Sequence, residues 1–191
     1  MAINTKTGIE PGMPVRYDST TIALHWLTVV LVVVLFALAE TWGFLPRGTP
    51  LRKQFQSLHI SLGIVLALVI MARLAWRATR GRRLPVAASG VQGWAAKAMD
   101  YALYLLLVVQ IVLGFVLRWA QAEAFQFFGL FSLQFATVKH AALSHTIGSL
   151  HDTVAWTIIV LASLHAAMAL IHHYILKDGL LRRMLSSMAG R

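Results

Sequence analysis

The 191-residue chain contains no cysteine, and this absence removes several classes of site at once. Disulfides are excluded, as are iron–sulfur clusters held by thiolates and haem attached through a C-x-x-C-H motif. Any metal or cofactor must therefore be held by other side chains, without a thioether link. The chain has eight histidines, and imidazole is the commonest metal ligand that remains.

Charged residues are also scarce. They make up 13% of the chain, and 58% is hydrophobic; a soluble domain is typically about 25% charged. Four apolar runs approach the roughly 20 residues that a helix needs to cross a bilayer. We predict an all-α integral membrane four-helix bundle, with spans near residues 21–42, 58–76, 101–119 and 153–174. The first run exceeds the roughly 7–15 residues of a signal-peptide core, so we expect it to remain as a span.

The net charge of +10 reflects 17 basic and seven acidic residues. Twelve basic residues fall in the amino tail, the second loop and the carboxyl tail, and five fall in the first and third loops. Because basic residues collect on the cytoplasmic side of membrane proteins, we expect both termini to be cytoplasmic. We interpret this charge as a topology signal and not as a nucleic-acid surface. The predicted organisation is a polar tail (1–19), a transmembrane domain (20–176) and a basic tail (177–191).

Histidines within an apolar segment are costly and usually mark a buried functional site. The last apolar run holds His151 and His165, which are 14 residues apart. Fourteen residues turn a helix through about 40° less than four full turns, so both side chains point the same way, about 21 Å apart along the axis. His59 is expected at the depth of His151, and His25 at the depth of His165. The spacing predicts two histidine pairs stacked along one bundle.

Two imidazoles that face each other inside a helical bundle are typical axial ligands of a b-type haem. A small residue lies four positions after three of the histidines, on the face where a porphyrin would approach: Gly63, Ala155 and Ala169. A zinc or copper site is the competing metal interpretation, but it would need three or four clustered ligands. A structural bundle with hydrogen-bonded histidines and no cofactor is the remaining alternative.

A second group of polar side chains ends the last apolar run. His172 follows His165 by seven residues and lies about 20° off the same face, so geometry leaves it as an alternative ligand. Its place near the headgroups suits a haem propionate or a quinone better, and we take His172, His173 and Tyr174 as quinone-side candidates. An interfacial histidine pair with no such role is the alternative. His145 is expected to be solvated and is a spare candidate for the outer pair.

Four stretches resemble the bacterial cytochrome b561 family: "ALHWL", "SLHISLGI", "LHDTVAW" and "LHAAMALIHHYILKDGLLRRM". The resemblance covers nearly the whole chain. It implies a four-helix bundle in the bacterial inner membrane that holds two b haems. His25 and His165 would ligate the cytoplasmic-side haem, and His59 and His151 the periplasmic-side haem. On this pattern the inner ligand is His165 and not His172.

The superoxide oxidase branch of the family is the most similar in pattern, which implies electron transfer from superoxide to ubiquinone. A cationic rim on the exterior would steer an anion such as superoxide. The candidates are Arg47, Arg52, Lys53 and Lys139, which are equally consistent with solvated loop residues. The alternative function is an electron conduit that docks a soluble dehydrogenase or hydrogenase and feeds quinone. The Phe-rich third loop, "AFQFFGLFSLQF", would then dock the partner, or it would cap the outer haem.

Overall fold

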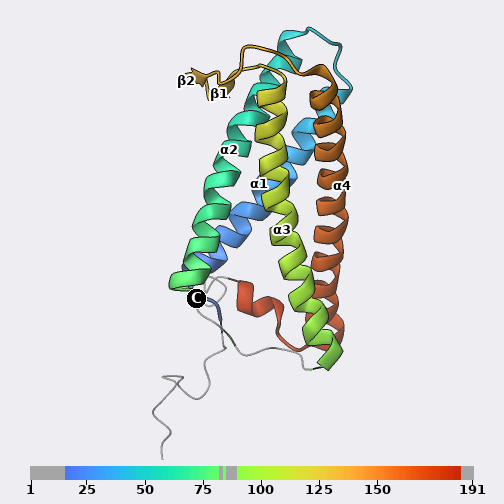
Figure 1. The fold of residues 1–191 in the computed structure, drawn as a ribbon. Coiled ribbons are helices and arrows are strands. Elements are labelled where there is room, and N and C mark those ends of the chain that lie inside the picture. Colours follow the sequence, from blue (N-terminus) through green and yellow to red (C-terminus); the bar gives the residue numbers. More distant parts are fainter. Residues whose placement is uncertain (1–15, 82–83, 85–89, 186–191) are drawn as a thin grey trace, which may run out of the picture.

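The computed structural model describes residues 16–81, 84 and 90–185. Four segments lie outside this part of the chain: residues 1–15, residues 82–83 and 85–89 of the second loop, and residues 186–191. Four long helices make up most of the fold (Figure 1): α1 (Ser19–Gly43), α2 (Pro50–Thr79), α3 (Gly90–Ala120) and α4 (Ala141–Ile171). They run alternately up and down, and short segments join them at both ends.

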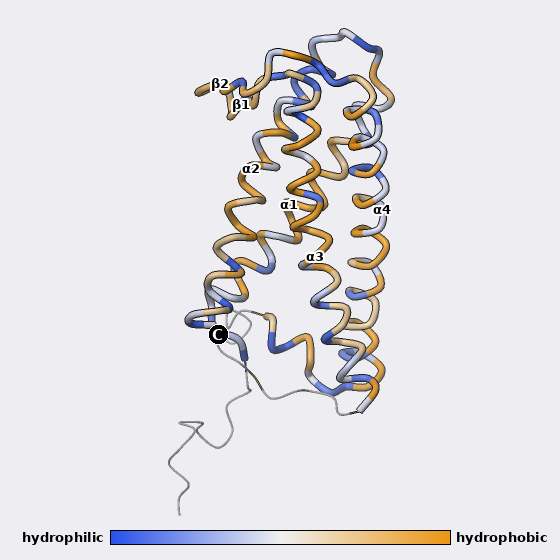
Figure 2. Tube along the Cα trace, viewed as in Figure 1, coloured by the Kyte–Doolittle hydropathy of each residue, from blue (hydrophilic) through white to orange (hydrophobic). Residues whose placement is uncertain are grey.

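The first three helices each contain one predicted span and extend beyond it, whereas the fourth span, 153–174, begins inside α4 and ends three residues beyond it, in a π-helical turn. All four are long and apolar enough to cross a membrane. Hydrophobic residues occupy the middle of each helix, and hydrophilic residues gather at the two ends of the bundle (Figure 2). The predicted all-α membrane bundle is confirmed; the positions of the bilayer boundaries stay predictions.

The first two helices begin at side chains that satisfy free backbone N–H groups. Asp18 precedes α1, and its carboxylate accepts from the backbone N–H of Thr21 at 2.9 Å. Thr49 precedes α2 in the same role and is followed by Pro50, which needs no partner at the first helical position. The same Asp18 carboxylate accepts from the Trp76 indole N–H at 2.8 Å, so it also joins the start of α1 to the end of α2.

The bundle consists of two antiparallel helix pairs, α1 with α2 and α3 with α4, which pack more closely within each pair than between pairs. Seven buried aliphatic residues from all four helices form the core: Leu31, Leu35, Leu66, Val69, Ile70, Leu107 and Ile158. Most other apolar side chains face outward, as expected for helices solvated by lipid. The looser seam between the two pairs leaves room for a cavity.

The Phe-rich third loop forms a β-hairpin, β1 (Phe125–Phe127) and β2 (Phe131–Leu133), which projects sideways beyond α2 (Figure 1). Phe128 and Gly129 both have positive φ, the geometry of a type I′ turn. Buried Ser61 of α2 anchors the hairpin, because its hydroxyl accepts from the Phe128 backbone N–H at 2.9 Å and lies 3.1 Å from the Gln126 carbonyl. We call this end of the bundle the hairpin end.

The segment after α4 crosses the opposite end of the bundle and returns to the start of α1 (Figure 1). Its two short elements are the π-helical turn η1 (His172–Leu176) and the 3-10 helix η2 (Leu181–Met184). The Tyr17 backbone N–H donates to the Arg183 carbonyl at 3.1 Å, and the Trp26 indole N–H donates to the Met184 carbonyl at 2.9 Å. We call residues 177–185 the terminal strap and this end of the bundle the terminal end.

Candidate functional site

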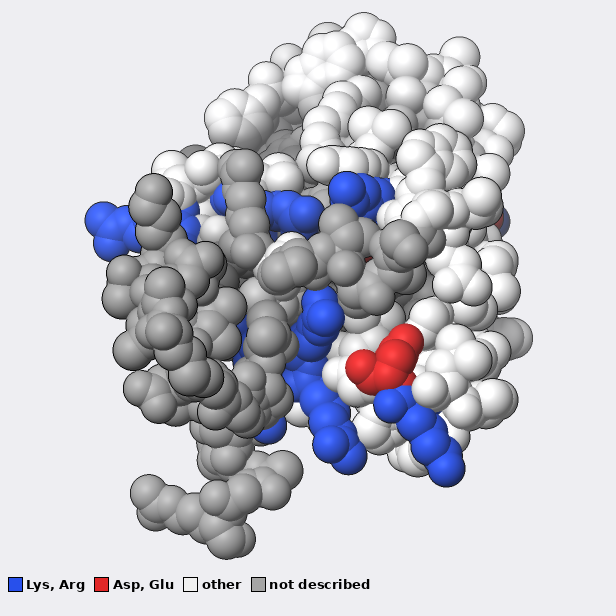
Figure 3. Space-filling view, turned by 90° about the horizontal axis from the view of Figure 1, so that it is seen from below, with Lys and Arg blue, Asp and Glu red and all other residues white. Residues whose placement is uncertain are grey.

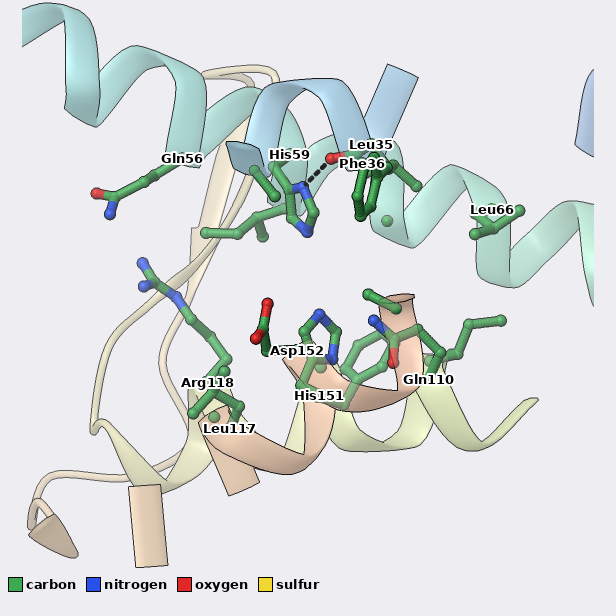
Figure 4. Close-up of a pocket in the computed structure, with 18 of the residues that line it drawn as sticks. Leu35, Phe36, Gln56, His59, Leu66, Gln110, Leu117, Arg118, His151 and Asp152 are labelled. Carbon is green, nitrogen blue, oxygen red and sulfur yellow. Dashed lines mark hydrogen bonds between the residues drawn. The ribbon is translucent and has the colours of Figure 1, made fainter. Parts of the chain in front are cut away.

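A cavity of about 470 Å³ lies at the seam between the helix pairs, toward the hairpin end. All four helices line it, with His59 on α2 and His151 on α4. The two imidazoles face each other across the cavity, with ring centroids 6.4 Å apart (Figure 4). A metal held between the rings by two bonds of about 2 Å each would need a similar separation, once the radii of the two rings are added. The predicted outer pair is therefore brought together in space.

The Nδ1 atom of each ring points toward the backbone of a neighbouring helix and away from the centre of the cavity (Figure 4). His59 Nδ1 lies 3.0 Å from the Leu35 carbonyl on α1, which can only accept, so this nitrogen carries the proton. His151 Nδ1 makes no hydrogen bond of good geometry, and the backbone of Gln110 lies close to it. A carbonyl at Nδ1 is the usual support of a metal-binding histidine, because it leaves the lone pair of Nε2 for the metal.

The walls of the cavity leave space for a flat ligand beside the two rings. Gly63 and Ala155, one turn along the helix from His59 and His151, both line it, and a Cβ atom added to Gly63 would meet nothing within 4 Å. On α3, a Cβ atom added to Gly114 would lie 3.3 Å from Cε1 of His151, so glycine there allows the ring its position. These features fit a haem whose iron is held between the two imidazoles.

Polar side chains surround the cavity where it approaches the hairpin end. Arg118 of α3 is half-buried and forms an ion pair with Glu123, and its Nε donates to the Ala124 carbonyl at 3.0 Å. Gln56 and Asp152 lie across from it (Figure 4). Sequence reasoning missed Arg118, Gln110 and Gly114 as cavity residues because α3 carries no histidine to draw attention to it.

The predicted inner pair lies nearer the terminal end. His25 sits in the second turn of α1, its ring packed edge-on against Trp26 with centroids 5.5 Å apart. His165 of α4 lies within electrostatic range of His25, and both side chains are half-buried. Because α4 is continuous from Ala141 to Ile171, His151 and His165 keep the predicted separation of about 21 Å along one helix.

A half-buried cation accompanies the inner pair. Nη2 of Arg73, on α2, lies 2.9 Å from Nδ1 of His25, and its guanidinium carbon lies 4.9 Å from the centroid of the Tyr104 ring. Arginine can only donate, so Nδ1 of His25 accepts in this arrangement. Binding of iron by Nε2 of a neutral His25 ring therefore requires Arg73 to turn away from Nδ1. The Tyr104 ring is a second partner that does not depend on His25.

The three quinone-side candidates do not share one site. His172 opens the π-helical turn, and its Nδ1 is hydrogen-bonded to Oδ2 of Asp178 in the terminal strap. A carboxylate only accepts, so Nδ1 carries the proton and Nε2 is left for another partner. His173 and Tyr174 instead line a separate cavity with Lys177. Among the described residues, no group of three or more His, Asp or Glu side chains could hold a metal ion, so the clustered site that zinc would need does not form there.

The four rim candidates belong to the two segments at the hairpin end. Arg47, Lys53 and Lys139 are exposed. Arg52 is half-buried and donates from Nη1 to the carbonyls at the end of α1, at 2.6 Å to Trp42 and 2.8 Å to Leu45. None of the four lines the cavity that holds His59 and His151. His145, the spare candidate for the outer pair, is also exposed and does not line it.

Removal of the Asp178 side chain is expected to loosen the terminal strap. The hydrogen bond from His172 holds the pKa of Asp178 below its ordinary value of 3.8, so the carboxylate stabilises the strap above that value and loses its effect as the pH falls below it. We expect amide hydrogens of Leu180 and Tyr17 to exchange up to about fivefold faster in Asp178→Ala, because an exposed pair contributes at most about 1 kcal/mol. Asp178→Asn should have a smaller effect, since one oxygen still accepts from Leu180. Unchanged exchange in Asp178→Ala would contradict this role.

Comparison with known proteins agrees with this architecture. A model of the family described as prokaryotic cytochrome b561 matches residues 16–187. Cytochrome b561 homolog 2 of Escherichia coli (strain K12) is 34% identical over 173 residues, which are 90% of this chain and 92% of that protein. Probable superoxide oxidase CybB of Yersinia pestis is 28% identical over 177 residues, which are 92% of this chain and 98% of that protein.

The family match covers nearly all of the chain, and a relative above 30% identity covers most of it. The family resemblance seen in the four sequence stretches is thus confirmed. The family consists of haem-binding membrane proteins of electron transport, and membership implies haem b. This chain therefore belongs to the prokaryotic cytochrome b561 family and is a membrane cytochrome that carries electrons.

Proposed function

We propose that the protein oxidises superoxide and delivers the electrons to a quinone, using two b haems held by His59 with His151 and by His25 with His165. The observation that carries most weight is the pair His59 and His151, which face each other in a cavity with polar side chains at the hairpin end. A site open to polar surroundings suits a water-soluble donor. The relative named as a probable superoxide oxidase supports superoxide as that donor.

The overall reaction balances simply. Two superoxide anions lose one electron each and leave as dioxygen, and these two electrons, with two protons, convert quinone to quinol. When bound, each haem supplies a one-electron redox centre. The chain's part is to hold the groups at two levels of one bundle, exclude water between them with the aliphatic core, and supply protons where quinone is reduced.

On the donor side, we propose that the exposed cations at the hairpin end raise the local concentration of superoxide. Three of these cations are exposed to solvent and can attract the anion directly: Arg47, Lys53 and Lys139. The Arg52 guanidinium also contributes positive charge, although it donates hydrogen bonds to two carbonyls. Arg118 lies nearer the cavity, but Glu123 offsets its charge. The rim would therefore steer the anion, and Arg118 would shape the cavity.

On the acceptor side, we propose that His172 lies against the quinone, which is ubiquinone in this scheme. Asp178 keeps the proton of a neutral His172 on Nδ1, so Nε2 can take up a proton and pass it to a quinone oxygen. The exposed carboxylate of Asp178 connects this pair to water. Both termini would then be cytoplasmic, in the bacterial inner membrane, with protons drawn from that side.

The direct test is to add superoxide to the oxidised, detergent-purified protein and to record haem reduction by absorbance. We expect rapid reduction that superoxide dismutase abolishes, and reoxidation when ubiquinone is added. The double variant Arg47→Gln/Lys53→Gln should reduce about tenfold more slowly at low ionic strength, and the difference should fade as salt is raised. The matched control Arg80→Gln/Lys97→Gln removes the same charge from two exposed residues at the other end of the bundle, one directly after α2 and one in α3, and should react like the wild type.

The second candidate is an electron conduit with a docked protein donor, and the hairpin favours it. Leu130, Phe131 and Phe135 are exposed at 77%, 51% and 71%, an apolar surface that a partner could cover. Buried Phe125 instead lines the cavity, so the hairpin also caps it. Haems that ignore superoxide but accept electrons from a reduced dehydrogenase would replace the first proposal with this one.

A further inference from the structure

A second cavity, of about 320 Å³, lies at the terminal end, where α4 gives way to the strap. Five residues line it: His173, Tyr174, Lys177, Gly179 and Arg182. His172 and Asp178 do not, so this cavity is separate from the acceptor side described above. It is also remote from the cavity of His59 and His151 at the hairpin end.

The charges around this cavity are of one sign. Lys177 and Arg182 are both exposed, and neither forms an ion pair with a carboxylate of the described chain. The nearest acidic residue in sequence, Asp178, is hydrogen-bonded to His172 and to the Leu180 N–H instead. The Tyr174 hydroxyl and the His173 ring add neutral donors. Two cations and two further donors around one hollow are the side chains that bind a phosphate group.

The backbone holds the cavity open. Lys177 ends the π-helical turn in the left-handed conformation, with φ of 55°, and Gly179 follows with φ of 72°. This pair of left-handed residues reverses the chain, so that Arg182 comes back to face the end of α4. A Cβ atom added to Gly179 would meet nothing within 4 Å, in keeping with open space on this side of the turn.

The position of the cavity along the bundle favours a phospholipid over a free phosphate ion as its ligand. It adjoins the point where the apolar run of α4 ends, and Ile175 and Leu176 beside it are 71% and 54% exposed. Lys and Arg side chains are spread over this face of the molecule, and Asp and Glu are sparse on its visible part (Figure 3). A free phosphate would explain the cations but not the exposed aliphatic side chains next to them. A phospholipid has both a phosphate and acyl chains at this level of a bilayer.

We propose that the cavity lined by Tyr174, Lys177 and Arg182 binds the phosphate headgroup of an anionic phospholipid. The acyl chains would lie along Ile175 and Leu176 on the outer surface of η1, which follows α4. The site requires only that this end of the bundle reach a bilayer surface. The proposal therefore does not depend on superoxide, on quinone or on the identity of the histidine ligands.

The test is phosphatidylglycerol binding to the haem-loaded, detergent-purified protein, measured by native mass spectrometry against phosphatidylcholine. Wild type should prefer phosphatidylglycerol, and Lys177→Gln/Arg182→Gln should weaken that binding about 30-fold, because each cation near an anionic headgroup contributes a factor of about five. The control Arg80→Gln/Lys97→Gln removes the same charge from the same end outside the cavity and should change binding less than twofold. Tyr174→Phe keeps both charges and should weaken binding several-fold. It provides the test if the double variant fails to fold.

Two further arms separate the sources of the ligand. Inorganic phosphate at millimolar concentration should compete only weakly with phosphatidylglycerol; equal binding of phosphate alone would show a free-anion site and overturn the lipid assignment. Equal losses in the cavity variant and the control would show general surface attraction and also overturn it. Unchanged binding in Lys177→Gln/Arg182→Gln, with an unchanged haem spectrum, would rule the site out.

Discussion

Replacement of His151 by alanine is expected to lower the haem content of the purified protein from the two per chain that we propose to one. His151 and His59 face each other at 6.4 Å in a cavity that fits one haem, so loss of either ring leaves the iron with one axial partner. His25 and His165 lie about four helical turns away and should keep their haem. The measurements are haem stoichiometry and the reduced-minus-oxidised spectrum.

The chain supplies a matched control on the same helix. His145 lies six residues before His151 and is exposed, so His145→Ala should retain two haems. His165→Ala should lose the other haem, and the spectra lost in the two variants should add up to that of the wild type. Two haems in His151→Ala would place the outer ligand elsewhere. An unaffected His165→Ala, together with loss of one haem in His172→Ala, would make His172 the inner ligand.

Replacement of Gly63 by leucine is expected to abolish haem binding in the same cavity without harm to the polypeptide. A Cβ atom at Gly63 meets nothing within 4 Å, so a leucine side chain would project into the cavity beside His59. Glycine within a helix is about 1 kcal/mol less favourable than alanine, so the helix itself gains from the change. We expect one haem per chain and thermal unfolding of the haem-free protein at or above that of the wild type.

Gly43 provides the comparison for this change. A Cβ atom there also meets nothing within 4 Å, but Gly43 ends α1 and does not line the cavity, so Gly43→Leu should keep two haems. Gly63→Ala adds only a methyl group and should lie between the two. A Gly63→Leu protein with its full haem content would show that no porphyrin approaches α2 at this point.

The helices and the two histidine levels were predictable because each depends on one physical rule. The bilayer requires apolar runs of about 20 residues, so the spans are visible in the sequence without knowledge of tertiary contacts. Helical periodicity alone places His151 and His165 on one face of α4, and the structure keeps that helix continuous. Which histidine faces His151 followed from depth, since successive spans of the chain cross the membrane in opposite directions and place His59 and His151 near the same face.

The hairpin was not predicted, although part of its signal is present. Phe125, Gln126 and Phe127 alternate in the strand pattern, but the turn uses Phe128 before Gly129 where Asn or Asp is usual. The uncharged aromatic segment was therefore interpreted as a loop that docks a partner or caps the outer haem, without strands of its own. Its position depends on Ser61, a buried serine on another element, and no local pattern marks such a partner.

The contributions of α3 and of the terminal strap could also not be predicted from the sequence. Gly114 matters only because His151 of a neighbouring helix lies 3.3 Å from where its Cβ would be. Arg73 looked like one of many cytoplasmic cations, yet its guanidinium reaches His25 on α1. His172, His173 and Tyr174 are consecutive and were grouped together, but the π-helical turn separates them between two sites. Each of these is a contact between distant segments.

The order in which the helices are made has a consequence for assembly. Each proposed ligand pair takes one histidine from the first two helices and the other from α4, which the ribosome synthesises last. A nascent chain with α1, α2 and α3 already inserted carries His25 and His59 but neither partner. Arrival of α4 would complete both pairs in a single insertion event. Haem loading would then report that synthesis is finished, and truncated chains would stay free of redox-active iron in the membrane.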